Sequence, residues 1–457
     1  MSEPWELTLS EGLRRLCGGT LNAEDWLVSI IARIDQCEEG VKAWVQVDRE
    51  GALEEARSVD REREAGKKVG ALAGVFYGAK DIFDIKGFRR EAGSPLFKGY
   101  EPNEDATCVE RLRSEGAIAL GKTVTTPLAN GDPSISRNPW NLAHSPGGSS
   151  AGSAAAVGAG MIPVALGSQT TGSTLRPASF CGVVGFKPTY GRIPRGGILK
   201  VSWTFDHPGI IARSVEDVAR MLPVMAGPDA SDDGAPDVPV PDYTAESAPR
   251  KPKRVGFFRE DTLPRASKEV ADQTARAVAQ LRESGVAVEE IKLPMETDKI
   301  HAAHFIARCV EASCYHEDMF IGNEDAFTPK NRETITTGFM VPAVHYLKAL
   351  RLRSRYVREM DRLFEHYDLA VLPTQSEKPP IWDVSTGDAS FSEPLTFSGH
   401  PALTLPVGRG EGNLPIGIQL GAGRFEEAGL LAVSRWCEEE LGWRAEIAEP
   451  EFSGQFI

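Results

Sequence analysis

Apolar residues recur along the chain with two different periods, which predict a mixture of helices and strands. After Asn22, a residue type that caps helices, apolar side chains follow at intervals of three to four residues as far as Ile34. Further helices are predicted at 54–64, 151–160, 214–226 and 342–366. Short apolar runs predict strands at 75–78, 118–121, 161–166 and 368–372.

Two of the predicted strands end beside residues that can carry chemistry. The strand at 75–78 delivers Lys80 at its end, and Gly167 is expected to break the strand at 161–166 into a loop at 169–173. The helix at 151–160 starts after Ser149 and Ser150, where exposed amide donors favour partial negative charge. The whole segment 146–191 is rich in small residues, which suits an active-site loop better than a core.

Net charge and cysteine content indicate which binding partners and which cellular compartment to expect. The formal net charge of −14 argues against a surface that tracks nucleic-acid phosphates. The seven cysteines are scattered and include no CxxC pair, which is typical of a reducing cytoplasm. No signal peptide is visible, and no apolar stretch approaches membrane-spanning length. We therefore expect a cytoplasmic protein without nucleic-acid or membrane partners.

Several motifs occur in the order of one known family. The cluster Gly147-Gly148-Ser149-Ser150 is followed by a run of small residues and by Gly172-Ser173, 24 positions after Ser149. Upstream stands GAKDIFD at 78–84, and downstream stand ARSVED at 212–217 and LPIGIQL at 414–420. In these motifs the chain resembles the amidase signature family of hydrolases. The resemblance covers nearly the whole chain and is weakest between about residues 228 and 354.

The resemblance implies an α/β fold, with one large domain whose mixed central β-sheet is covered on both faces by α-helices. Within the domain 1–457 we expect an N-terminal helical part at about 1–65 and a catalytic core at 66–226. A variable substrate wall at about 228–354 and a C-terminal part at 355–457 that completes the sheet would follow. The Pro-, Asp- and Ala-rich stretch 227–253 is interpreted as a surface excursion, because family motifs lie on both sides of it.

The resemblance also implies roles for individual residues. Lys80 would be the base, Ser149 the proton bridge and Ser173 the nucleophile, with a cis peptide bond between Gly148 and Ser149. The backbone amides of the turn would form the oxyanion hole, which comprises Thr170, Thr171, Gly172 and Ser173. The expected substrate-binding residues are Gly148, Ser150 and Arg176. Neither a metal nor a cofactor is implied.

The sequence departs from the family pattern at the oxyanion turn. Many relatives read Asp-Thr-Gly-Gly-Ser, whereas this chain reads QTTGS at 169–173. Gln169 removes a charge, and Thr171 would be strained if its position required a positive φ. Arg176 could bind a substrate carboxylate, as in malonamidase-like relatives, or pair with an acidic neighbour such as Asp206.

Structural roles and other functions compete with this interpretation. Lys80 could be a surface lysine paired with Asp81 or Asp84, and one of the two serines before residue 151 could cap the helix. The segment 148–152 satisfies G-x-S-x-G and would make Ser150 the nucleophile of an α/β-hydrolase, although no predicted strand leads into it.

Two further alternatives remain. His301 and His304, with Cys309 and His316 nearby, could form a metal site, although their spacing fits a helix lining a cleft better than any strong zinc pattern. The family also includes the amidase subunit of tRNA-dependent amidotransferases, which works inside a complex. Gln169 and the order Thr174-Leu175-Arg176 depart from that subunit's usual pattern.

The sequence therefore predicts a cofactor-free serine hydrolase that cleaves amide C–N bonds, with carbamates (urethanes) and esters as further substrate classes. A homodimer is left open as its assembly. Trp203, the stretch 301–346 and residues 397–400 are expected to form the substrate wall. Its apolar side chains favour an uncharged or aromatic substrate, although ordinary helix packing explains them equally well; they are Phe305, Met319, Phe320, Phe327, Phe339 and Met340.

Overall fold

The computed structural model describes residues 3–443 and 446–450, and its strands form one sheet. In the described residues eleven strands lie in the order β1-β3-β2-β4-β6-β5-β10-β11-β9-β7-β8. Neighbours are parallel along β3-β2-β4 and along β9-β7-β8, and antiparallel elsewhere. The predicted mixed sheet is confirmed. Its strands are β1 (Trp44–Val47), β2 (Phe76–Lys80), β3 (Ile118–Thr123), β4 (Val164–Gln169), β5 (Val184–Lys187), β6 (His207–Ala212), β7 (Arg254–Phe257), β8 (Ala287–Glu290), β9 (Leu369–Pro373), β10 (Ala402–Arg409) and β11 (Pro415–Gly421).

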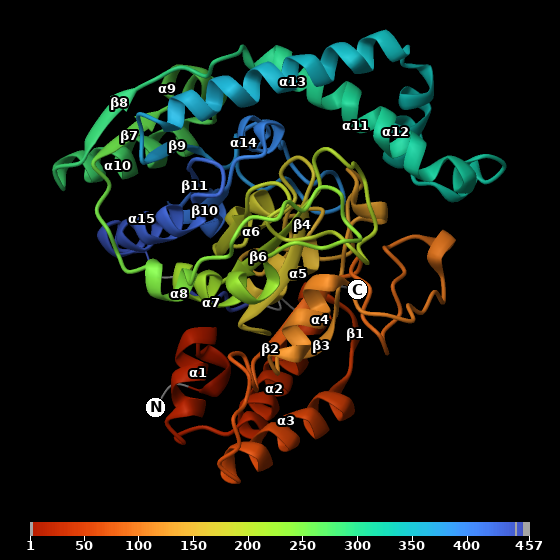
Figure 1. The fold of residues 1–457 in the computed structure, drawn as a ribbon, viewed down its shortest axis with the longest axis vertical. Coiled ribbons are helices and arrows are strands. Elements are labelled where there is room, and N and C mark those ends of the chain that lie inside the picture. Colours follow the sequence, from red (N-terminus) through yellow and green to blue (C-terminus); the bar gives the residue numbers. More distant parts are fainter. Residues whose placement is uncertain (1–2, 444–445, 451–457) are drawn as a thin grey trace.

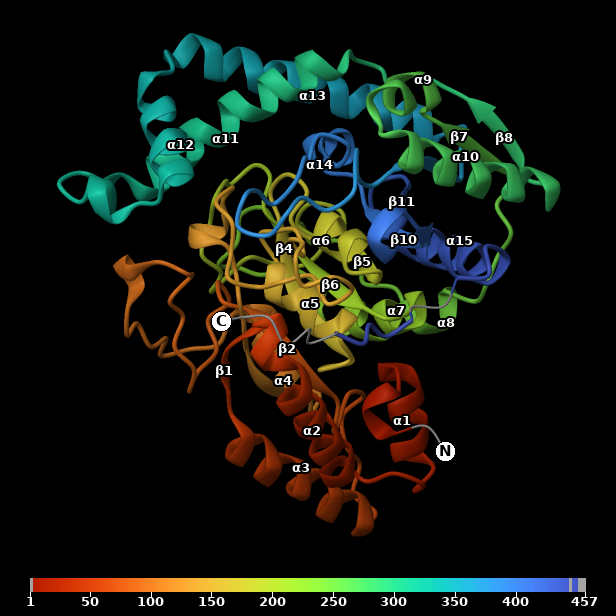
Figure 2. The ribbon, with the colours of Figure 1, turned by 180° about the vertical axis from the view of Figure 1, so that it is seen from behind.

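Helices surround this sheet, with α1, α2 and α3 at one end of the molecule and the long α11 and α13 at the other (Figures 1 and 2). No described helix has the length and apolar character needed to cross a membrane. The α-helices are α1 (Leu9–Cys17), α2 (Ala23–Val41), α3 (Arg49–Glu64), α4 (Thr107–Ser114), α5 (Ala151–Gly158), α6 (Leu175–Phe180), α7 (Val215–Met225), α8 (Tyr243–Glu246), α9 (Arg259–Thr262), α10 (Lys268–Glu283), α11 (Thr297–Phe320), α12 (Pro329–Met340), α13 (Ala343–Phe364), α14 (Glu393–Ser398) and α15 (Glu427–Glu440). Short 3-10 turns are η1 (Pro4–Glu6), η2 (Pro95–Phe97), η3 (Pro127–Ala129), η4 (Leu263–Arg265), η5 (Glu324–Ala326) and η6 (Glu411–Asn413).

The sheet separates two hydrophobic cores, because successive side chains of a strand point to opposite faces. In β4, Val164 and Leu166 belong to one core and Ala165 to the other. The first core includes buried residues of α4, α7, α10 and α15, and the second includes those of α2, α3 and α5. A third core joins β9 to α11, α13 and α14. The expected helical cover on both faces is therefore confirmed.

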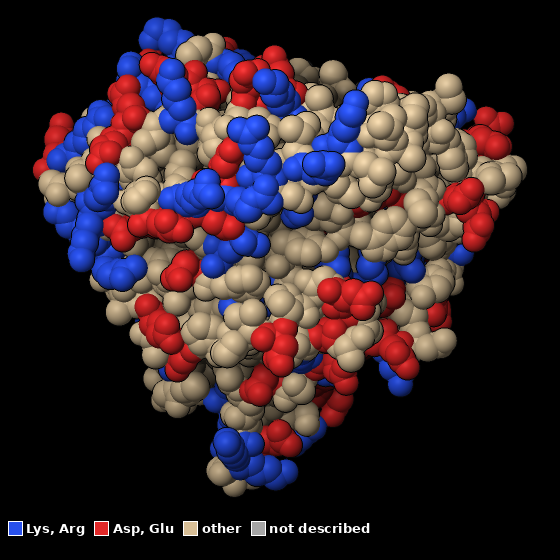
Figure 3. Space-filling model, turned by 45° about the horizontal axis from the view of Figure 1, so that its top comes forward, with Lys and Arg blue, Asp and Glu red and all other residues tan. Residues whose placement is uncertain are grey.

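Charged side chains of both signs share the surface of the molecule. On the face drawn in Figure 3, Lys and Arg side chains lie interspersed with Asp and Glu side chains. The described residues include exposed ion pairs, such as Arg254 with Glu289 at 2.9 Å and Lys292 with Glu260 at 2.7 Å. The acidic excess of the chain is thus spread over a mixed surface on this face.

The predicted helices are present, and α2, α3 and α7 each start after a capping side chain. The Asn22 side chain accepts a hydrogen bond from Asp25 N–H at 2.6 Å and begins α2. The helix predicted from residue 54 begins earlier, as α3, because Asp48 caps it by accepting from Gly51 N–H at 2.9 Å. Ser214 caps α7 in the same way.

The predicted boundary at Gly167 is wrong. β4 continues through Gly167 to Gln169, and Gly167 pairs with Gly209 of β6. Glycine is needed there for space, because a Cβ on Gly167 would lie 3.0 Å from Ser150 Oγ. β4 also starts at Val164 rather than at 161.

The stretch 227–253 packs against the rest of the chain. β6 precedes this stretch and β7 follows it, and both strands belong to the same sheet. Within it Tyr243 is completely buried, and Arg192 donates to the carbonyl oxygens of Val238 and Pro239 at 3.2 and 2.9 Å. These contacts agree with an excursion and not with a flexible linker.

Candidate active site

Strand order brings Lys80 and Ser168 to the same edge of the sheet. Lys80 ends β2, Ser168 is the last residue but one of β4, and these two strands are parallel neighbours. The start of α5 reaches this edge as well. Ser150 Oγ accepts from Ser168 N–H at 3.2 Å and donates to the Ser168 carbonyl oxygen at 3.3 Å. Three separate segments of the sequence therefore meet around one lysine.

The Lys80 amine is completely buried and contacts two hydroxyl groups. Its Nζ donates to Ser149 Oγ and to Ser168 Oγ, each at 2.7 Å. Burial lowers the pKa of Lys80 to about 7, against an opposing effect of the Asp206 carboxylate. Near neutral pH much of the amine is therefore uncharged and able to accept a proton.

The interpretation of Lys80 as a surface lysine paired with a nearby aspartate is wrong. Asp81 pairs with a different buried lysine, Lys122, at 2.9 Å between Oδ1 and Nζ. Asp84 pairs with Arg90 at 2.9 Å. Both aspartates of the motif thus have their own cations.

Ser149 is positioned by its backbone. The peptide bond between Gly148 and Ser149 is cis, as the resemblance implies. The Ser149 carbonyl oxygen accepts from Thr126 N–H and from Thr125 Oγ1, both at 3.2 Å. A Cβ on Gly148 would lie 2.8 Å from Thr386 Cγ2, so no larger residue fits before Ser149.

Ser173 lies in the turn after β4 and is half-buried. Its carbonyl oxygen accepts from Ser150 N–H at 3.2 Å, which ties the turn to the start of α5. Among the hydrogen bonds of the described residues, none joins the hydroxyl groups of Ser149 and Ser173. The contact between bridge and nucleophile therefore stays a prediction.

Ser150 stands at the N-cap position of α5, but its side chain makes no capping hydrogen bond, so the capping alternative is not found for Ser150. Its hydroxyl is completely buried and bonded to the Ser168 backbone instead. Residues 145–150 contain no strand, so the strand–turn–helix elbow of an α/β-hydrolase is missing at this point of the described chain.

Gln169 forms hydrogen bonds with both ends of its side-chain amide around the turn at 169–173. Its Oε1 accepts from the N–H groups of Thr174 and Leu175, each at 2.9 Å, and its Nε2 donates to Thr396 Oγ1 at 2.9 Å. A neutral amide donates and accepts at once, whereas a carboxylate only accepts. The departure from the family's aspartate thus adds a hydrogen bond to α14.

The turn itself presents unpaired backbone donors. Within the described part of the chain, the N–H groups of Thr171, Gly172 and Ser173 donate to no protein acceptor. Thr171 has no positive φ there, so the strain considered for it does not occur. Gly172 lacks room for a side chain, because a Cβ would lie 3.1 Å from Ala389 Cβ. Three consecutive free amides suit an oxyanion hole.

α11 holds the same turn from another side. His304 Nε2 donates to the Thr170 carbonyl oxygen at 3.0 Å. Glu393 of α14 contacts His304 Nδ1 at 3.4 Å and His301 Nδ1 at 3.0 Å. Burial favours a raised pKa for Glu393, but the two histidines bring that pKa down to about 2. No group of His, Cys, Asp or Glu among the described residues is arranged to hold a metal, so the metal site considered for α11 is not found there.

Arg176 joins two loops and does not pair with Asp206. Its Nη2 donates to the Gly148 carbonyl oxygen at 2.6 Å and to Thr386 Oγ1 at 3.1 Å, and its Nη1 donates to the Gly387 carbonyl oxygen. Burial lowers the pKa of Arg176 to about 10. Its Nε is buried without a partner.

The expected apolar wall divides into core residues and solvent-exposed residues. The rings of Phe320 and Phe327 pack in a core with their centroids 5.0 Å apart, and Phe397 is also buried. Phe339 and Met340 are 45% and 77% exposed. The packing interpretation therefore holds for the buried rings, and the preference for an apolar substrate loses their support.

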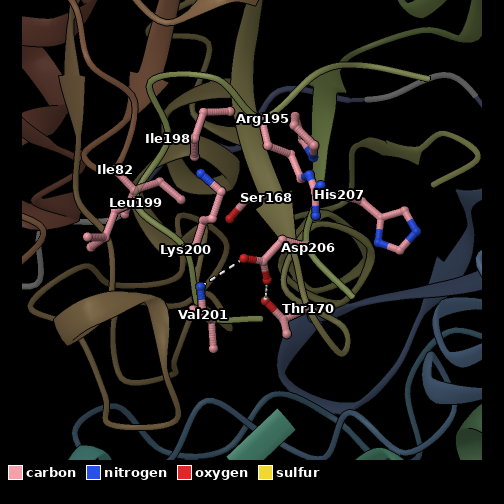
Figure 4. Close-up of a pocket in the computed structure, with 11 residues that line it drawn as sticks. Ile82, Ser168, Thr170, Arg195, Ile198, Leu199, Lys200, Val201, Asp206 and His207 are labelled. Carbon is pink, nitrogen blue, oxygen red and sulfur yellow. Dashed lines mark hydrogen bonds between the residues drawn. The ribbon is translucent and has the colours of Figure 1, made fainter. Parts of the chain in front are cut away.

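Sequence reasoning missed Ser168, and it singled out Asp206 and His304 only for other roles, as a partner of Arg176 and as part of a metal site or cleft-lining helix. Ser168 and Asp206 line a small cavity of about 10 Å³ (Figure 4). Asp206 accepts from Thr170 Oγ1 at 2.6 Å. Ser168 could have been found as a polar residue near the end of a strand parallel to β2. The other two come from distant segments and carry no local signal.

Comparison with known proteins assigns the chain to a protein family. A family model described as Amidase matches residues 25–431. The chain is 37% identical over 456 residues to a glutamyl-tRNA(Gln) amidotransferase subunit of Moorella thermoacetica, covering 92% of this chain and 93% of that protein.

Solved structures show the same fold. A chain from a vestigial protein complex that reveals the evolutionary origins of an s-triazine catabolic enzyme has a TM-score of 0.88 and 28% identity, covering 97% of this chain and 100% of that one. The native peptide amidase from Stenotrophomonas maltophilia has a TM-score of 0.82 and 27% identity, covering 98% and 99%. The fold and site thus define a hydrolase that acts on C–N bonds. The chain belongs to the amidase family, whose members are the amidase signature enzymes.

Proposed function

We propose that this protein is an amidohydrolase that cleaves amide C–N bonds through an acyl-enzyme on Ser173. The observation that carries the proposal is the 2.7 Å contact between Lys80 Nζ and Ser149 Oγ in a buried site. A buried amine with a pKa of about 7 is a proton acceptor at neutral pH. A serine hydroxyl needs such a base before it can attack a carbonyl carbon.

In the first step Ser173 Oγ attacks the carbonyl carbon of the amide. Its proton passes to Ser149 Oγ, and the Ser149 proton passes to Lys80 Nζ, which becomes an ammonium group. The carbonyl oxygen takes up negative charge as the new C–O bond forms. The free N–H groups of 171–173 would bind that oxyanion, and one such donor typically contributes about 3 kcal/mol to transition-state stabilisation.

In the second step the C–N bond breaks. An amide nitrogen is a poor leaving group, so the proton on Lys80 returns through Ser149 to that nitrogen. Water then attacks the acyl group on Ser173 and gives its proton to the same relay. The Ser173 oxygen recovers a proton as the acid product leaves, and the site returns to its first state.

The substrate is an amide in the first instance, with carbamates and esters as related acyl compounds. Gly148 and Ser150 shape the site through backbone contacts. Both terminal nitrogens of Arg176 already donate to loop residues, and its Nε is buried. We therefore assign Arg176 first to holding the two loops together.

A second candidate function follows from the names of the relatives. The Moorella thermoacetica relative belongs to a glutamyl-tRNA(Gln) amidotransferase as one of its subunits. A protein that works only within such a complex would show little turnover on its own. Ammonia release from simple amides by the purified chain favours the stand-alone enzyme, whereas absent turnover with co-purifying partner proteins favours the alternative.

The direct test is turnover of matched amides, carbamates and esters by the purified protein across pH. We expect kcat/KM to rise through about pH 7, because only the neutral Lys80 amine accepts a proton and its pKa is about 7. Lys80→Ala and Ser173→Ala should each lower kcat by at least about 10³-fold, since residues that act as a unit fail together.

Circular dichroism of both variants controls for folding. A folded Lys80→Ala enzyme with a near-normal rate would exclude lysine as the base. A profile that falls from pH 6 to pH 9, with stability unchanged, would contradict the assignment as well.

A further inference from the structure

A small cavity is lined in part by Ser168, which contacts Lys80 but takes no part in the proposed proton relay. Its volume of about 10 Å³ is close to the smallest that holds one water molecule. Polar and charged residues line it beside apolar ones (Figure 4); they are Ser168, Thr170, Arg195, Lys200, Asp206 and His207. The cavity is therefore a place where a water molecule finds hydrogen-bond partners.

Both carboxyl oxygens of Asp206 accept hydrogen bonds beside this cavity. They accept these bonds from Thr170 Oγ1 at 2.6 Å, Val201 N–H at 2.8 Å and Ser202 N–H at 3.0 Å. Burial raises the pKa of Asp206, while these bonds favour its charged form. No cation of the described chain lies within ion-pair distance of it. The Arg195 guanidinium also acts to lower the pKa of Asp206 without bonding it, so a further positive charge nearby would favour the carboxylate form.

Ser168 connects this carboxylate to the lysine. Its Oγ accepts from Lys80 Nζ at 2.7 Å. Its hydroxyl hydrogen has no acceptor among the described residues, so it is available to the cavity. Lys80 and Asp206 are therefore connected by the Ser168 hydroxyl group and by a cavity that can hold one water molecule.

We propose that Asp206 is a positioning residue that stabilises the Lys80 ammonium group formed during catalysis, acting through Ser168 and a water molecule in the cavity. The inference rests on the proposed function, in which Lys80 takes and returns a proton. While the amine is neutral, the site carries the negative charge of Asp206. When the amine is protonated the two charges compensate, and a low-dielectric site makes that interaction strong. No proton is transferred to Asp206.

The test variants leave the other charged groups near Lys80 and the cavity unchanged, and several of these groups are paired. Arg195 bonds Asp232 at 2.9 Å, and Lys122 bonds Asp81 at 2.9 Å. Burial keeps the pKa of His207 well below its usual value, so that ring is neutral at pH 7. The titratable groups that line the cavity are Arg195, Lys200, Asp206 and His207.

The test compares pH–rate profiles of the wild type, Asp206→Asn and Asp206→Ser. Asparagine keeps the shape and an acceptor oxygen but removes the charge. Without that charge the ammonium form is less stable, so Lys80 loses its proton at lower pH. We expect the acid limb of kcat/KM to move down by roughly one pH unit in Asp206→Asn. The plateau should fall about tenfold, because proton transfer is less well supported.

Asp217→Asn is the matched control. Asp217 is a buried carboxylate with a raised pKa that accepts from Ser10 N–H at 2.8 Å, and it does not line the cavity. Its replacement should lower stability and leave the acid limb in place.

The outcomes separate the two claims. A lower plateau with an unmoved acid limb in Asp206→Asn would overturn the inference and leave the proposed function standing. A wild type without lysine-dependent turnover would remove the proposed function itself. If Asp206→Asn does not fold, Asp206→Ser decides, since it removes the same charge and leaves the contact between Lys80 and Ser168 in place. A downward shift of its acid limb supports the inference, and an unshifted limb overturns it.

Discussion

At the residue scale, the site depends on one lysine whose side chain is desolvated in the folded protein. Lys80 has no exposed surface, and no carboxylate of the described residues is bonded to its Nζ. Its pKa of about 7 lies far below the ordinary value of 10.5. The folded state therefore gives up stability to keep a neutral amine next to Ser149. Function and stability should oppose each other at this position.

Replacement of Lys80 by methionine should make the protein inactive and more stable. Between pH 7 and about 10.5 the unfolded chain holds the lysine proton and the folded chain does not, so wild-type stability rises with pH in that window. The gain from Lys80→Met should be about 2–5 kcal/mol at pH 6 and should shrink as pH rises. Urea unfolding at pH 6 and pH 9 measures it.

The control for this substitution is Lys187→Met, at a lysine that is also completely buried, with a pKa of about 7, but bonded to backbone carbonyls away from the serines. Its free energy of unfolding should change with pH in a similar way, while the contact between Lys80 and Ser149 stays intact. A Lys80→Met protein that is less stable than the wild type at pH 6, or whose gain grows with pH, would contradict the assigned burial cost.

At the scale of elements, helices that are far apart in sequence hold the oxyanion turn. α11 reaches it through His304 and the Thr170 carbonyl oxygen. α14 reaches it through Thr396, which donates to the Thr171 carbonyl oxygen at 2.8 Å and accepts from Gln169. The turn's free amides thus owe their direction to elements outside the catalytic motif.

His304→Leu should weaken catalysis by misplacing these amides. The change leaves the buried Thr170 carbonyl oxygen without its donor, which costs about 1–3 kcal/mol of stability. We expect kcat to fall about tenfold or more with a smaller change in KM, because the turn acts on the transition state. Steady-state kinetics and thermal unfolding measure both effects.

His316→Leu is the matched control on the same helix. His316 is also buried, burial lowers its pKa to about 4, and its Nδ1 has no hydrogen-bond partner. That variant should keep kcat. Equal losses of kcat in the two variants would show that α11 acts only through general stability.

The motif residues could be predicted from the sequence, and their supports could not. Lys80 and Ser149 stand in recognisable local patterns, so their meeting was foreseeable. Asp206 and His304 reach the site only through strand pairing and helix packing, which no short motif records. Gly167 misled the prediction because it serves close packing against Ser150 and not a turn.

At the scale of the whole molecule, one sheet runs through every part of the chain. Inside the region expected to vary, β7 pairs with β9 and β8 pairs with β7, so both strands join the sheet that carries Lys80. The mixed sheet and its cover of helices were predictable from the family resemblance. The strand order was not, because it depends on contacts between distant segments.

A continuous sheet predicts a single cooperative unfolding transition. Far-ultraviolet circular dichroism and tryptophan fluorescence should give the same midpoint in urea, since no described part has a separate sheet of its own. Two resolved transitions, with 228–354 unfolding first in hydrogen exchange, would mean that this region is an independent unit.

The most direct test of the central claim is to find which serine forms the covalent bond. The purified protein is treated with a fluorophosphonate at pH 8, and the modified peptide is mapped by mass spectrometry. We expect the adduct on Ser173, with the rate of labelling at least about 10²-fold lower in Lys80→Ala, because the hydroxyl then lacks its base. An adduct on Ser150, or labelling of Ser173 at an undiminished rate in folded Lys80→Ala, would contradict the account.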